Sequence, residues 1–68
     1  MPTTPAANVR AELARRSITR QQLGAAIGMG RESLSRRLRE QTDFTVGEIT
    51  SIADYLGIPV CDLLNGAA

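Results

Sequence analysis

The sequence predicts a small, all-helical domain. Two capping boxes of the Thr-x-x-Gln/Glu type mark helix starts, and apolar residues recur every three or four positions along the chain. We find no stretch that alternates apolar and polar residues as a half-buried strand does. The 68 residues leave room for one domain over residues 1–68, and 43% hydrophobic with 22% charged residues is the balance of a folded globular protein.

The first helix is predicted over residues 5–16. Thr4 is a suitable N-cap and Pro5 fits the first helical position, and the apolar residues that follow have helical spacing. Residues 1–4 are expected to form a flexible arm. The arginines of this helix are expected to lie on a solvated face; they are Arg10, Arg15 and Arg16.

A second, short helix is predicted after Thr19, ending near Ile27. Thr19 and Gln22 form a capping box, and Gly28 can adopt the left-handed conformation that ends a helix. The next amphipathic segment begins only three residues later. Two helices joined by a Gly-x-Gly turn of this length are typical of a steeply crossing helix pair.

The third helix is predicted over residues 31–41, with Gly30 as its N-cap. At about 100° per residue, Leu34 and Leu38 share one side of this helix. The opposite side and its amino-terminal border carry polar residues, namely Glu32, Arg36 and Arg39 opposite the leucines, and Arg31 and Ser35 at the border.

The outward face of the third helix has two interpretations. It can fit the major groove of DNA, where arginine donates to guanine and glutamate accepts from cytosine. Alternatively, the charges form a solvated surface in which Glu32 and Arg36 are an ordinary i,i+4 ion pair. The turn, the caps and the uneven charge distribution together favour the first interpretation.

A fourth helix is predicted from the Thr45–Glu48 capping box to Gly57, and Pro59 prevents its continuation. Residues 60–64 are expected to add a short apolar turn that closes the core. Three hydrophobic staples accompany the predicted helix starts: Ile18 with Leu23, Met29 with Leu34, and Phe44 with Ile49.

The charge is unevenly distributed along the chain. The formal net charge is only +1, but all eight basic residues are arginines within residues 1–42, where three acids reduce the charge to +5. Residues 43–68 contain four acids and no base, a charge of −4. This distribution predicts one face that attracts phosphate.

Several functional classes have little support in the composition. Without histidine, and with Cys61 as the single cysteine, the chain offers no recognisable zinc spacing or common general base, so neither a metal nor a cofactor is expected. Cys61 is expected to pack structurally beside Val60, Leu63 and Leu64. No apolar run approaches the ~18 residues of a membrane span, and cytosolic location is the expectation.

Residues 18–38, ITRQQLGAAIGMGRESLSRRL, resemble the Cro/repressor-type helix-turn-helix domains of phage and bacterial regulators. Residues 44–64, FTVGEITSIADYLGIPVCDLL, look like the fourth and fifth helices of that family, so the likeness covers nearly the whole chain. The resemblance implies a compact, five-helix, lambda-repressor-like DNA-binding domain.

The resemblance also implies roles for individual residues. Phosphate-binding residues would be Arg20, Gln21, Arg39 and Thr42, and base-reading residues would be Arg31, Glu32, Ser35 and Arg36. Three positions depart from the family pattern. Gly24 replaces an alanine, Gly30 replaces a Ser or Thr cap, and Arg37 stands where many members are apolar.

The partner implied by the resemblance is a double-stranded DNA operator, bound by a Cro-like or repressor-like transcriptional regulator in the bacterial cytosol, on the nucleoid. A homodimer is expected, at least on DNA. Its predicted surface is formed by Tyr55, Val60, Leu63 and Leu64. No membrane and no small-molecule ligand is implied. The alternatives are an antitoxin-like or antirepressor protein-interaction module and, with least support, an enzyme.

Overall fold

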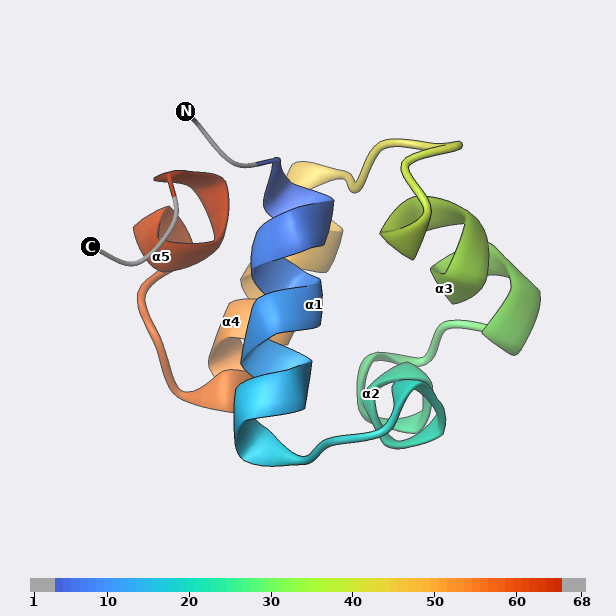
Figure 1. Ribbon diagram of the computed structural model, residues 1–68, viewed down its shortest axis with the longest axis horizontal. Helices are drawn as coiled ribbons and strands as arrows, with labels where there is room; N and C mark the ends of the chain where they lie inside the picture. Colours follow the sequence, from blue (N-terminus) through green and yellow to red (C-terminus); the bar gives the residue numbers. More distant parts are fainter. Residues whose placement is uncertain (1–3, 66–68) are drawn as a thin grey trace.

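The computed structural model describes residues 4–65 as five helices without a strand in that range (Figure 1). The helices are α1 (Pro5–Arg16), α2 (Arg20–Ile27), α3 (Arg31–Leu38), α4 (Val46–Leu56) and α5 (Val60–Asn65). The predicted all-helical, five-helix fold is confirmed. Residues 1–3 of the predicted arm lie outside the described residues, and Thr4 caps α1 by accepting a hydrogen bond from Ala7 N–H at 3.1 Å.

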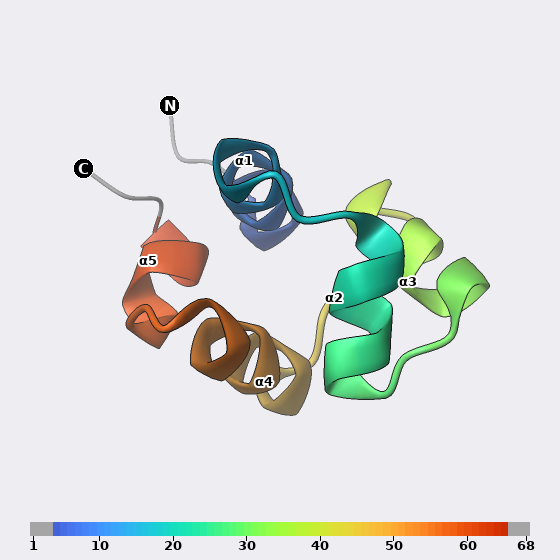
Figure 2. The ribbon, with the colours of Figure 1, turned by 90° about the horizontal axis from the view of Figure 1, so that it is seen from below.

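The helices form a ring around one core (Figure 2). α1 contacts α3 and α5, α2 contacts α3 and α4, and α4 contacts α5. The core contains apolar residues from every helix: Val9, Leu13, Leu23, Leu34, Leu38, Ile49, Ile52, Ala53, Leu56 and Leu63. α2 and α3 lie together on the side of the ring opposite α5, and this places the helix pair away from the acidic end of the chain.

Both predicted capping boxes are present. Thr19 accepts from Gln22 N–H at 3.0 Å while Gln22 accepts from Thr19 N–H at 2.8 Å, and Thr45 and Glu48 do the same at 3.1 and 2.8 Å. Each reciprocal pair satisfies two backbone donors that the helix start leaves unpaired. The apolar residue before each box, Ile18 or Phe44, is partly buried against the core, as a staple requires.

A residue in the left-handed conformation caps α1, α2 and α4, and one follows the C-cap of α3. Gly28 and Gly57 have φ of 71°, whereas Ser17 and Glu40 adopt 56° and 63° without being glycine. The predicted end of α3 at Gln41 is therefore wrong, because Glu40 N–H donates to the Arg37 carbonyl and Gln41 N–H to the Arg36 carbonyl. These backbone bonds close the helix at Leu38.

Gly24 lies where α2 approaches the turn that leads into α3. A Cβ atom at this position would be 2.8 Å from the carbonyl oxygen of Met29 and 3.6 Å from Leu34 Cδ2. Real Cβ atoms do not approach a backbone oxygen so closely. The glycine that departs from the family pattern is therefore required by the closeness of the turn.

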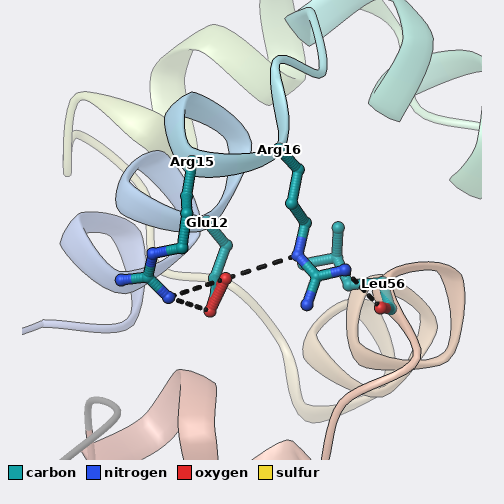
Figure 3. A network of polar contacts seen from close by, with 4 residues as sticks. All are labelled: Glu12, Arg15, Arg16 and Leu56. Carbon is teal, nitrogen blue, oxygen red and sulfur yellow. Dashed lines mark hydrogen bonds and ion pairs between the residues drawn. The ribbon is translucent and has the colours of Figure 1, made fainter.

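Two arginines of α1, Arg10 and Arg16, are exposed as predicted, but they also bind the carboxyl ends of other helices. Arg10 donates to the Leu38 carbonyl at the end of α3 and forms an ion pair with Glu40 at 3.7 Å. Arg16 donates to the Leu56 carbonyl at the end of α4 at 2.9 Å (Figure 3). Both guanidiniums neutralise the negative end of a helix and satisfy carbonyls that lack a helical partner.

Glu12 is the acid that orders the end of α1. It is 6% exposed and accepts from Arg15 Nη1 at 3.0 and 3.1 Å and from Arg16 Nε at 3.4 Å (Figure 3). A buried carboxylate must be paired to remain charged, and here two guanidiniums pair with it. No local pattern in the sequence indicates that this acid is buried.

Arg37 links α3 to the start of α4. Its Nε donates to Glu48 Oε1 at 2.9 Å and its Nη1 donates to the Ser33 carbonyl at 3.0 Å. Burial acts to raise the pKa of Glu48, but hydrogen bonds from the Thr45 N–H and from Arg37 outweigh it and hold the pKa below its ordinary value of 4.5. The arginine in a usually apolar position therefore forms a partly buried ion pair with the capping box.

Two expectations about α5 are wrong. Cys61 is exposed instead of packed, and Leu63 is fully buried instead of being on a surface. Leu63 points into the core, and its carbonyl accepts from Asn8 Nδ2 at 2.6 Å, which joins α5 to α1. Within residues 4–65, no helix is long and apolar enough to cross a bilayer.

The substitution Gly24→Ala is expected to lower the free energy of unfolding by about 1–3 kcal/mol, because the new methyl group overlaps the Met29 carbonyl. Gly47→Ala is the matched control, since a Cβ there is 3.9 Å from Thr45 Oγ1. The control should stabilise α4 by up to about 1 kcal/mol through helix propensity. Urea unfolding measures both, and equal effects would contradict the close approach.

A second prediction concerns pH. Because the folded-state pKa of Glu48 lies below 4.5, its contribution to stability is complete above that pH and is lost as pH falls through the lower folded value. The substitution Glu48→Gln keeps a capping acceptor but removes the titration. Unfolding free energies measured from about pH 6 to about pH 3 should therefore fall less for this variant than for the wild type; parallel curves would refute the assignment.

Candidate nucleic-acid interface

Arg20 and Arg31 are the first residues of α2 and α3, the two helices that the short turn joins. Both side chains are exposed. A helix start presents unpaired N–H groups and a partial positive charge, and both features attract anions. Two such starts, each reinforced by an arginine, belong to one helix pair.

An open groove of about 700 Å³ lies along this helix pair. It is lined by Arg20, Gln21, Gly24, Ala25, Met29, Arg31, Ser35 and Arg39. The groove brings together three of the four predicted phosphate-binding residues and two of the four predicted base-reading residues. Its lining contains no acid, so the local field is positive.

The three arginines of this groove differ from the other five in their partners. Within residues 4–65, no acid forms an ion pair with Arg20, Arg31 or Arg39. The remaining arginines all pair with acids of the domain; they are Arg10, Arg15, Arg16, Arg36 and Arg37. Four acids pair with these five arginines, since Arg15 and Arg16 share Glu12. Most of the positive charge without an ion-pair partner therefore lies in the groove.

Glu32 and Arg36 lie outside the groove on the exposed side of α3. Arg36 Nη2 and Glu32 Oε1 are 3.3 Å apart, and the side chains are 58% and 82% exposed. This is the i,i+4 ion pair that the second interpretation of the face requires. Such an exposed pair contributes about 0.3–0.5 kcal/mol, so it does not prevent either side chain from taking another partner.

Thr42 does not join the other predicted residues. It lines a separate, smaller groove that includes Glu40 and Asp43 as well as Arg37 and the start of α1 at Pro5. The early end of α3 at Leu38 explains the separation, because the chain turns at Glu40 before it reaches Thr42. The acids in this second groove make it less suited to phosphate.

Two arginines near the end of α3 have positions that helical periodicity does not predict. Periodicity predicts Arg39 on the outward face of the helix, whereas Arg39 is the C-cap residue and lines the groove from the end of α3. Arg10 is not part of the groove but holds the last carbonyl of α3. A long-range contact of this kind leaves no local signal in the sequence.

The groove lacks the side-chain groups that most often bind a metal ion. Its lining lacks carboxylate, thiol and imidazole groups. Among the described residues, no group of three or more His, Cys, Asp or Glu residues is placed to hold a metal ion. The chemistry of the groove is that of hydrogen-bond donation to anions.

Comparisons with known proteins agree with this arrangement. A helix-turn-helix family model matches residues 9–63. The P22 c2 repressor, solved in complex with a synthetic operator, is similar in structure with a TM-score of 0.82 and 20% identity, over 96% of this chain and 98% of that one. No curated protein matches the sequence.

A second solved structure has the same fold within a much longer chain. It is the Streptomyces albus enzyme HEPD, solved with Fe(II) and 2-hydroxyethylphosphonate bound, and the TM-score is 0.83 with 25% identity. The match covers 96% of this chain but only 15% of the enzyme. Because the family model spans most of the sequence, from Val9 to Leu63, the chain belongs to the helix-turn-helix family, with the lambda-repressor-like fold of the Cro/repressor type.

Proposed function

We propose that the protein is a sequence-specific regulator of transcription that binds a double-stranded DNA operator, in the manner of a Cro-like or repressor-like protein. The observation that carries the proposal is the groove between α2 and α3. It collects the three arginines that have no acidic partner among residues 4–65: Arg20 and Arg31 at the starts of two adjacent helices, and Arg39 at the end of α3. Phosphates of a DNA strand are the ligands that this arrangement attracts.

The residues divide into two proposed roles. Arg20, Gln21 and Arg39 line the groove and bind the DNA backbone, which positions the domain. Base edges face the exposed side of α3; the residues proposed to contact them are Arg31, Glu32, Ser35 and Arg36. Thr42 lies apart from the groove, so in our proposal it contacts a DNA phosphate where the duplex reaches the loop after α3.

The domain is proposed to bind as a homodimer, at least on DNA. A single domain of this size buries a modest interface, so two copies on half-sites about one helical turn apart, ~34 Å, give useful affinity. The proposed dimer surface includes Tyr55 and Leu64, which are 44% and 48% exposed, and the partly buried Val60. Leu63 is not part of it, because that side chain is in the core.

In this proposal the protein regulates transcription by occupying its operator. A protein that covers an operator excludes polymerase or a competing repressor from the same DNA. The P22 c2 repressor, which shares the fold over 98% of its chain, was solved on such an operator. The proposed place of action is the bacterial cytosol, on the nucleoid.

The fold alone does not decide between functions, since the same domain is found inside the enzyme HEPD. The deciding experiment is a gel-shift titration of the full chain with DNA from the flanks of its own gene, at increasing salt. Binding that weakens steeply with salt supports the proposal. Absence of binding at low salt would instead support an antitoxin-like or antirepressor module that binds a protein.

The two roles predict different effects of two exposed arginines. Arg36→Ala should cost about 1–3 kcal/mol on the preferred site and relax its sequence preference. Arg20→Ala should weaken binding to all duplexes alike and reduce the salt slope by about 1. The control is Arg15→Gln, which removes the same charge from α1, outside the groove, while it keeps a hydrogen-bond donor near Glu12 and leaves the Arg16–Glu12 pair in place. Equal losses on specific and random DNA for both variants would contradict the division of roles.

A further inference from the structure

The exposed surface around α3 has two parts with different electrostatic character. Arg31 and Ser35 belong to the groove, which no carboxylate lines. Glu32 and Arg36 lie beside it and pair with one another. The groove carries positive charge without a carboxylate, whereas the second part presents a hydrogen-bond acceptor and a donor next to each other.

The Glu32–Arg36 contact leaves the guanidinium able to donate elsewhere. Arg36 Nη2 donates to Glu32 Oε1 at 3.3 Å, and a guanidinium has five N–H groups. The two side chains are exposed, so the contact orients them without contributing much to stability. Glu32 is also on the amino-terminal side of Arg36, the favourable order for an i,i+4 pair on a helix.

A carboxylate is an unfavourable group on a surface that faces DNA. It repels phosphates and weakens binding unless a base donates a hydrogen bond to it. In the major groove, cytosine N4 is such a donor, and it lies beside guanine O6, which arginine recognises. A carboxylate and a guanidinium one helical turn apart therefore match the donor and the acceptors of one G·C base pair.

We propose that Glu32 and Arg36 act as one unit that recognises a single G·C base pair. Arg36 donates to guanine O6 and N7, and Glu32 accepts from cytosine N4 while it orients the guanidinium. The inference rests on the proposed DNA-binding function and adds the base pair that this part of α3 selects. The proposal also explains why a carboxylate, that of Glu32, lies on this surface, although it weakens binding to any duplex in which no base amino group faces it.

The test uses the full chain and a randomised pool of DNA duplexes. The preferred site is selected from the pool, each of its base pairs is then replaced in turn, and Kd is measured by fluorescence anisotropy. The proteins compared are the wild type, Glu32→Gln, Arg36→Gln and the double variant. Asp54→Asn, which removes an exposed acid from α4, is the matched control for the loss of one negative charge.

Glu32→Gln is expected to weaken binding to the selected site by about tenfold and to tighten binding to duplexes mismatched at one G·C pair by about twofold. A role in stability alone would weaken both. Arg36→Gln should lose discrimination at the same base pair, and the double variant should lose less than the sum of the two single losses, because the two side chains act together. Asp54→Asn should change binding to all duplexes equally, by less than about twofold.

Three results would overturn the inference. The first is a Glu32→Gln variant that discriminates between base pairs as well as the wild type does. The others are substitutions of Glu32 and Arg36 that affect different base pairs, or that affect one base pair which is not G·C. A wild-type chain that selects no site and binds no duplex at low salt contradicts the proposed function itself, and the inference with it. Thermal melts by circular dichroism confirm that each variant is folded. Glu32→Ala provides a second measurement of the acid's role.

Discussion

The anchoring of α3 at both ends is the constraint on which the rest of the structure depends. A helix of eight residues is unstable in isolation, so contacts with other elements must hold it. At its start, the turn packs against Gly24 of α2; at its end, Arg10 binds the last carbonyl and Arg37 binds Glu48. Leu34 and Leu38 then fill the core between these anchors, and the opposite side of α3 is left for a ligand.

Local patterns in the sequence predicted the helix starts well, because the signals that begin a helix are local. A capping threonine and its partner three residues later determine the backbone there, and Thr19 and Thr45 behave as predicted. The predicted last residue of α3, Gln41, is wrong because Glu40 adopts the left-handed conformation that glycine most often adopts. Its ion pair with Arg10, thirty residues earlier in the chain, is invisible to any local pattern.

The candidate site could be predicted only in part for the same reason. Helical periodicity was enough to separate the leucines of α3 from Glu32 and Arg36, and the structure places them on opposite sides. Periodicity could not show which arginines the fold uses internally. Arg10 and Arg16 bind helix ends formed by distant residues, and Cys61 and Leu63 exchange their expected environments because the register of α5 depends on tertiary packing.

The ion pairs of the domain also separate the residues that maintain the fold from those available for recognition. Arg10, Arg16 and Arg37 bind groups on other helices of the domain, and mutation at these positions would remove contacts that join the helices. Glu32 and Arg36 are exposed and bind only each other among residues 4–65. Substitution of this pair therefore leaves the contacts that hold the five helices together intact, so the exposed side of α3 can change its chemistry while the scaffold stays the same.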